Sequence, residues 1–320
     1  MTNNAKKRQV DVSVLIPISE ARHDDLTRVF NSHKDILEDL DLSYEFIFVF
    51  DGHYPDEVQS LAALAEKCPE TLKIIKFNKY YGEAKALNTA FLASEGKLIL
   101  TLPAYFQVKP QEIKKLFAEF SDEVDVIVGW RYPRRDNLLN RTQSNFFHWL
   151  INSFSGESFH DISCGVRLMR RKVPERINLY GDLHRFIPLL AINKGFRAIE
   201  IPLRQAREDI HLRIYGIGVY LRRLLDVLTL FFLIKFTQKP LRFFGLLGFG
   251  LSFIGLLISL VTVFQRIFGD QGLSERPLFL VGILFLLVGL QTFFIGLVAE
   301  IIIFTHMPSE PDYNIEKIVE

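Results

Sequence analysis

Short apolar runs alternate with segments of helical spacing over the first 130 residues of the chain. The apolar runs predict strands at Val12–Pro17, Tyr44–Asp51, Leu72–Phe77, Lys97–Leu102 and Val124–Trp130. The segments between them predict helices at Asp24–Leu37, Pro55–Cys68, Gly82–Ser94 and Pro110–Phe120. Nearly continuous apolar strands separated by helices are typical of a mostly parallel sheet covered on both faces. The pattern therefore predicts a doubly wound, Rossmann-like α/β domain.

Four polar segments follow the ends of predicted strands. In a parallel α/β sheet, ligands bind beyond the carboxyl ends of the strands. The segments at those positions are Pro17–Glu20, Asp51–His53, Leu102–Gln107 and Trp130–Arg131. We therefore expect a binding site to be built from them.

Two long apolar segments follow the α/β pattern. Phe243–Phe264 contains no charged residue, and Pro277–Phe304 contains only Glu300. About 20 apolar residues cross the hydrocarbon core of a bilayer, so both segments are long enough. The alternative is a pair of buried core helices, but two such runs with a short polar connector are typical of a transmembrane hairpin.

The segment 215–236 differs from both regions. Its first half mixes Arg222, Arg223 and Asp226 with apolar residues, and its second half is almost wholly apolar. This pattern predicts amphipathic helices on a membrane surface, with an ordinary core helix as the alternative. The expected organisation is an α/β domain over 1–212, interfacial helices over 213–240, a transmembrane hairpin over 241–306 and a tail over 307–320.

Charge and cysteine content narrow the functional classes. A net charge of +1 over 320 residues gives no reason to expect a nucleic-acid partner. Cys68 and Cys164 lie far apart in the sequence and suit a reducing compartment. Residues 1–9 are polar and basic and precede no apolar run, so the sequence predicts no signal peptide. We expect a multi-pass protein of the plasma (inner) membrane, with its α/β domain and tail in the cytoplasm.

Several stretches of the chain share an order and spacing with known motifs. They are Ser13–Leu26 (SVLIPISEARHDDL), Tyr44–Gly52 (YEFIFVFDG), Tyr80–Phe91 (YYGEAKALNTAF), Asp125–Gly156, Asp161–Val173 (DISCGVRLMRRKV) and Lys239–Gly248 (KPLRFFGLLG). With the two apolar segments, this order resembles the polyprenyl-phosphate glycosyltransferases. These are inverting family 2 enzymes with a GT-A fold, similar to dolichol-phosphate mannose synthase.

The resemblance implies a membrane-bound enzyme with two substrates. Such enzymes move a hexose from a UDP- or GDP-sugar to polyprenyl phosphate, undecaprenyl or dolichyl, at the cytoplasmic membrane face. Assembly into a homo-oligomer through the membrane helices is a further implication. The alternative is a catalytically degenerate relative that binds nucleotide sugar, lipid or a partner subunit as a scaffold.

The chain departs from the family's metal motif. The family's Asp-x-Asp aligns with Pro103, Ala104 and Tyr105, which leaves Gln107 as the nearest oxygen ligand. Mg²⁺ or Mn²⁺ is usually held by carboxylates, so a metal is only weakly supported here. Three other motif residues are also replaced. Phe50 stands for the first Asp of Asp-Asp-Gly-Ser, Ser19 for the Asn of Asn-Glu and Tyr80 for the Asn of Asn-x-Gly. Transfer without a metal would require Arg, Lys or backbone N–H groups to neutralise the diphosphate.

The candidate residues fall into three groups by role. The catalytic candidates are Arg131, Gln107, Arg207 and Arg213. The nucleotide-sugar candidates are Pro17, Glu20, Asp51, Gly52 and Tyr105. By resemblance, Arg141 and Ser144 would bind the acceptor phosphate.

Each group has a structural alternative. Asp51 could cap the turn before Pro55, and Glu20 could cap the helix from Asp24. The arginines could meet lipid headgroups, and Arg141 with Ser144 could lie on an exposed helix face. A site filled by Tyr105, Phe106 or Tyr80 would favour the alternative function, that of a catalytically degenerate scaffold.

Overall fold

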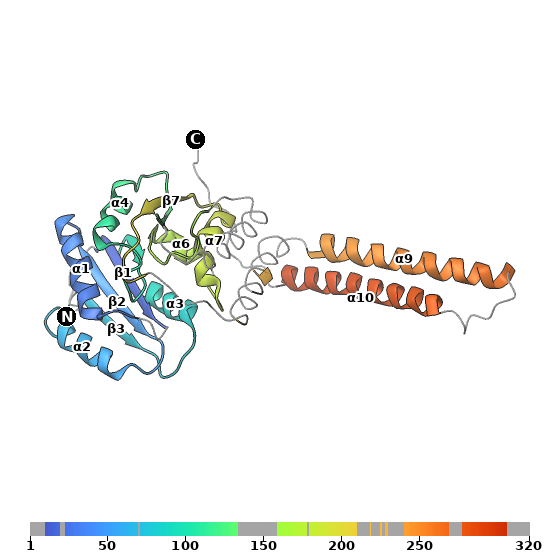
Figure 1. Ribbon diagram of the computed structural model, residues 1–320, viewed down its shortest axis with the longest axis horizontal. Helices are drawn as coiled ribbons and strands as arrows, with labels where there is room; N and C mark the ends of the chain where they lie inside the picture. Colours follow the sequence, from blue (N-terminus) through green and yellow to red (C-terminus); the bar gives the residue numbers. More distant parts are fainter. Residues whose placement is uncertain are drawn as a thin grey trace, which may run out of the picture. The chain divides into compact units, whose positions relative to one another are not determined.

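The computed structural model describes most of the chain (Figure 1). The described residues are 10–19, 23–69, 71–133, 159–177, 179–209, 218, 225, 228–229, 240–268 and 277–305. The chain forms two compact units, one of Met1–Leu230 with Tyr313–Glu320 and one of Phe231–Asp312. The interfacial helices predicted over 215–236 lie outside the described residues, apart from isolated helical positions.

A seven-stranded sheet forms the centre of the first unit, in the order β3-β2-β1-β4-β6-β5-β7. Its strands are β1 Val12–Ile18, β2 Tyr44–Phe50, β3 Leu72–Lys76, β4 Leu98–Thr101, β5 Val126–Arg131, β6 Arg167–Arg170 and β7 Ala198–Leu203. Every neighbouring pair is parallel except the two that β6 forms with β4 and β5. The predicted doubly wound, mostly parallel sheet is confirmed, whereas the sequence pattern did not reveal β6 and β7.

Helices cover both faces of this sheet (Figure 1). They are α1 Leu26–Asp39, α2 Pro55–Ala65, α3 Glu83–Ala93, η1 Pro110–Glu112, α4 Ile113–Ala118, α6 Lys172–Arg176, η2 Leu183–Phe186 and α7 Ile187–Asn193. Leu26, Val29 and Phe30 of α1 join the core cluster formed by alternate residues of β1. The helix α3 packs against β1 and β2. Asp25 caps α1 by accepting the N–H groups of Thr27 (2.9 Å) and Arg28 (3.3 Å).

The second unit contains two long helices, α9 Pro240–Phe268 and α10 Pro277–Thr305. Each has 29 residues and is apolar enough to cross a membrane. Only 17% of the most apolar part of α9 and 11% of that of α10 is buried. Large apolar side chains point outward along both helices, which core helices of a soluble protein would bury. The two predicted apolar helices are therefore confirmed.

Glycines allow α9 and α10 to pack closely. Gly248 and Gly255 of α9 face Gly289 and Gly282 of α10, with a spacing of seven residues in each helix, and Gly296 lies against Phe244 and Gly245 near the start of α9. A Cβ atom on Gly248 would lie 2.6 Å from the carbonyl oxygen of Gly289, and one on Gly255 would lie 2.6 Å from that of Gly282. Such small residues let helix backbones approach in an apolar environment.

The only charged residue of α10 has a specific partner on α9. The backbone N–H of Leu241, in the first turn of α9, donates to Glu300 Oε2 at 3.2 Å. A carboxylate at this place satisfies an N–H group without an intrahelical partner and complements the helix dipole. Glu300 therefore joins the end of α10 to the start of α9.

Candidate active site

The strand order places the candidate residues at one edge of the sheet. Strand β1 lies between β2 and β4. The strands β2 and β3 are on one side of β1 and the later strands are on its other side, so the strand order reverses at β1. Ligands bind at such switch points in open α/β sheets. Asp51 follows β2, the turn 102–107 follows β4, and Arg131 ends β5. Pro17 differs from these residues because it lies inside β1, where it pairs with Val49 and is buried.

Asp51 fixes the loop that leads into α3. Its side chain accepts the backbone N–H groups of Tyr81 (2.6 Å) and Gly82 (2.8 Å). Its own N–H donates to the carbonyl oxygen of Ile18 at 2.9 Å, and the residue is 1% exposed. Gly82 has φ +100° and Gly52 has φ +127°, conformations that favour glycine at both positions. Contact of Asp51 and Gly52 with a nucleotide sugar stays a prediction.

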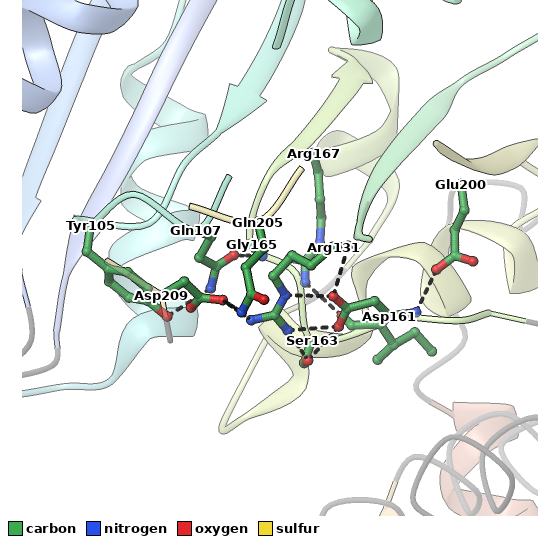
Figure 2. A network of polar contacts seen from close by, with 11 residues as sticks. Tyr105, Gln107, Arg131, Asp161, Ser163, Gly165, Arg167, Glu200, Gln205 and Asp209 are labelled. Atoms are coloured by element: carbon green, nitrogen blue, oxygen red, sulfur yellow. Dashed lines mark hydrogen bonds and ion pairs between the residues drawn. The ribbon is translucent and has the colours of Figure 1, made fainter. Parts of the chain in front are cut away.

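The turn after β4 is attached to the start of β6 through Gln107 (Figure 2). Gln107 Oε1 accepts the N–H of Gly165 at 2.7 Å, and Nε2 donates to the hydroxyl of Tyr105 at 2.9 Å. The Thr101 hydroxyl adds a bond to the Gly165 carbonyl at 2.8 Å. Gln107 is buried, so its side-chain amide forms both of these hydrogen bonds away from solvent.

Asp24 holds the other side of this turn, a role that the sequence did not reveal. Its Oδ2 accepts the N–H of Phe106 at 2.9 Å, and its N–H donates to the Ala104 carbonyl at 3.0 Å. Phe106 is buried and stacks on His33, so it belongs to the core. Tyr80 is 65% exposed. Of the three aromatic residues that could fill the site, Tyr105 accepts a hydrogen bond from Gln107.

Arg131 lies between two buried carboxylates (Figure 2). Its Nε and Nη2 donate to Asp161 at 2.6 and 2.9 Å, and its Nη1 donates to Asp209 at 3.0 Å. Nη2 also contacts the hydroxyl of Ser163 at 2.8 Å. Burial alone would lower the Arg131 pKa, but the negative charges of Asp161 and Asp209 outweigh it and raise the pKa well above its ordinary value.

Arg167 supplies a second buried guanidinium, on β6. Its Nη1 donates to the carbonyl oxygen of His184 at 2.8 Å, and its Nη2 donates to those of Ile162 and Arg185 at 3.3 Å each. Burial lowers the Arg167 pKa. The stretch Asp161–Val173 is one of those that carry the family resemblance, but the sequence alone indicated no role for Asp161 or Arg167. The spacing of Asp161, Gly165 and Arg167 was the available signal.

A further polar cluster surrounds the first residue of α3. Glu83 Oε2 lies 3.5 Å from the Ser19 hydroxyl, which donates to it, and 3.3 Å from His184 Nε2. Burial, helped by the charges of Arg185 and Arg167, lowers the His184 pKa to about 3, so this imidazole is neutral at physiological pH. Sequence analysis did not single out Glu83 or His184.

The remaining candidates are exposed or undescribed. Arg207 is exposed and lies two residues before Asp209. Glu20, Arg141, Ser144 and Arg213 lie outside the described residues. Within the described part of the chain, no three His, Cys, Asp or Glu side chains are grouped so that they could hold a metal ion.

Comparison with known proteins places these residues in a family context. The model of glycosyl transferase family 2 matches residues 13–177. A dodecaprenyl-phosphate galacturonate synthase of Rhizobium johnstonii is 28% identical over 283 residues, with 87% of this chain and 84% of the relative covered. An undecaprenyl-phosphate 4-deoxy-4-formamido-L-arabinose transferase of Klebsiella pneumoniae is 29% identical over 311 residues, with 96% and 93% covered.

A solved structure shows the same fold. The mannosyl-3-phosphoglycerate synthase of Rubrobacter xylanophilus has a TM-score of 0.50 at 16% identity, with 68% of this chain and 72% of that chain covered. At this identity the likeness extends to the arrangement of the sheet and its helices.

Proposed function

The chain belongs to glycosyl transferase family 2, and we propose that it transfers a hexose from a UDP- or GDP-sugar to polyprenyl phosphate at the cytoplasmic face of a membrane. Membership of the family makes the chain a glycosyltransferase. The nature of the donor, the acceptor and the membrane face is the proposal.

The extent of the likeness to polyprenyl-phosphate transferases carries this proposal. The alignment with the Klebsiella transferase covers 96% of this chain, so it includes the α/β unit together with α9 and α10. Both relatives named above act on a lipid phosphate according to their names. An α/β unit attached to two apolar helices can reach a water-soluble donor and a lipid acceptor at the same surface.

The reaction makes modest demands on acid–base chemistry. An oxygen of the acceptor phosphate attacks the anomeric carbon of the sugar, and the bond from that carbon to the diphosphate oxygen breaks. The nucleoside diphosphate leaves with the electron pair of that bond. Because the acceptor phosphate is already anionic, it needs no strong general base. The main demand is stabilisation of the charge on the leaving diphosphate.

The candidate residues have distinct roles in this proposal. The loop held by Asp51, together with Gly52, would contact the nucleoside, and Arg207 with Arg213 would meet the diphosphate. Arg141 and Ser144 would bind the acceptor phosphate. Arg131 donates hydrogen bonds to Asp161 and Asp209. We therefore propose that it positions the end of β5 against the segments that contain these two residues.

Acceptor dependence tests the proposal. The full-length protein in detergent would be incubated with a panel of radiolabelled UDP- and GDP-sugars and with polyprenyl phosphate, and the lipid-extractable label would be counted. The matched control is the polyprenol of the same length without its phosphate. We expect label in lipid only with the phosphate. A folded protein that transfers from no donor would support the scaffold instead.

A further inference from the structure

The turn that holds a metal in many family 2 enzymes has a different chemical character here. Pro103, Ala104 and Tyr105 stand at the Asp-x-Asp positions and provide no carboxylate. Mg²⁺ and Mn²⁺ prefer carboxylate and other hard oxygen ligands. The side-chain oxygen closest in sequence that suits such an ion is Oε1 of Gln107, and it already accepts the N–H of Gly165 at 2.7 Å.

This oxygen lies between the turn after β4 and the segment that leads into β6. A Cβ atom placed on Gly165 would lie 3.4 Å from Pro103 Cδ and 3.5 Å from Gln107 Oε1. The start of β6 and the turn after β4 are therefore in close contact. An ion at Gln107 Oε1 would compete with the N–H of Gly165 for a single neutral oxygen, which is a poor ligand for a divalent cation.

The carboxylates near this edge of the sheet are also engaged. Asp51 accepts two backbone N–H groups, and Asp24 accepts the N–H of Phe106. Asp161 forms a two-point contact with Arg131, and Asp209 accepts bonds from Arg131 and Gln205. In addition, the described part of the chain groups no three His, Cys, Asp or Glu side chains around one position, so the described residues at this edge do not fit a divalent cation.

We propose that this chain binds its nucleotide sugar without a divalent cation, and that the Gln107 amide takes over the task of fixing the turn after β4. The bridge from Tyr105 through Gln107 to Gly165 joins β4 to β6 through hydrogen bonds alone. Gln107 is thus a positioning residue, since it acts through Tyr105 and Gly165. This inference rests on the proposed nucleotide-sugar donor.

Mn²⁺ binding tests the first part without any turnover. The electron paramagnetic resonance signal of free Mn²⁺ would be recorded with the full-length protein in detergent, with and without UDP or GDP. The same nucleotide without protein corrects for its own affinity for Mn²⁺, and a family 2 transferase that keeps Asp-x-Asp is the positive control. We expect this protein to remove no further Mn²⁺ from solution. Protein-dependent binding of one ion per chain would overturn the proposal.

A pair of Gln107 variants tests the second part. In Gln107→Glu, the carboxylate can accept the N–H of Gly165 and the hydroxyl proton of Tyr105, so we expect nucleotide affinity to be retained. In Gln107→Ala the bridge is absent, and we expect a higher Kd for UDP or GDP than in the wild type, measured in the presence of EDTA. Equal affinity of the two variants would remove the positioning role. Failure of sugar transfer alone would count against the proposed function and leave both binding results standing.

Discussion

Arg131 and Asp161 form a two-point contact inside the protein, with Nε to Oδ2 at 2.6 Å and Nη2 to Oδ1 at 2.9 Å. Asp209 completes the cluster at 3.0 Å from Nη1. The guanidinium joins the end of β5 to two segments that follow it at 30 and 78 residues in the sequence. This arrangement gives Arg131 a stabilising role at the edge of the site.

Arg131→Ala is expected to destabilise the α/β unit. The substitution leaves two buried carboxylates without their cation, which lowers the free energy of unfolding by about 3–5 kcal/mol. Thermal unfolding of the full-length protein in detergent measures the change. Arg207→Ala is the matched control, because this exposed side chain contributes within about 0.5 kcal/mol. An Arg131→Ala protein that melts like the wild type would show that the guanidinium does not stabilise this edge.

Asp51→Ala is expected to abolish nucleotide binding. The carboxylate holds the N–H groups of Tyr81 and Gly82, so its loss releases the loop at the proposed nucleoside site. Calorimetric titration with UDP and GDP measures the effect. Asp56→Ala, on the exposed face of α2, controls for loss of a nearby negative charge. Unchanged affinity in Asp51→Ala would remove Asp51 from the nucleotide site.

Acid is expected to destabilise the α/β unit through two buried histidines. Burial lowers the pKa of His33 to about 4, against the opposing effect of its bond to the Val29 carbonyl, and burial lowers that of His184 to about 3. Below pH 6.5 these two imidazoles become protonated in the unfolded chain but stay neutral in the folded protein. The stability present above pH 6.5 is therefore lost progressively as the pH falls to about 4 for His33 and to about 3 for His184, with His33 accounting for about 2 kcal/mol at pH 5.

A His33→Asn variant isolates that contribution. Its amide can donate to the Val29 carbonyl but does not titrate, so its stability should fall less between pH 7 and pH 5. Denaturant unfolding at both pH values measures the difference. His53→Asn is the control, because His53 is exposed. Equal pH dependence of wild type and His33→Asn would contradict the prediction.

Glu300→Ala is expected to weaken the helical hairpin. Without the carboxylate, the N–H of Leu241 loses its partner, and helix-cap substitutions of this kind cost about 0.5–2 kcal/mol. Glu300→Gln keeps a neutral acceptor and should cost less. Circular dichroism during heating of the full-length protein in detergent compares the three proteins. Identical unfolding of all three would show that this cap contributes nothing.

The sequence predicted five of the seven strands and missed β6 and β7. β1 and β2 are buried on both faces, so their pattern is unmistakable. β6 is a four-residue strand with arginine at each end, and β7 alternates at the edge of the sheet. Neither pattern stands out from a loop, because short or edge strands need fewer apolar residues.

The candidate site could be located from sequence, but its contacts could not. The strand-end rule pointed to Asp51, Gln107 and Arg131, and all three lie at the carboxyl edge. No local pattern indicates that Asp161 and Asp209 enclose Arg131, because these pairs depend on the tertiary fold. Asp24 appeared only as a helix start, and its bond to Phe106 joins segments 82 residues apart.

Transfer of label from UDP- and GDP-sugars to polyprenyl phosphate, run side by side in EDTA and in Mg²⁺ or Mn²⁺, is the most direct measurement. We predict lipid-linked sugar from one donor at a rate that EDTA does not reduce, since the edge of the sheet is held together by hydrogen bonds and ion pairs of the protein. Transfer that EDTA abolishes and Mn²⁺ restores would contradict the metal-free site. A folded protein with no transfer from any donor would contradict the enzymatic function itself.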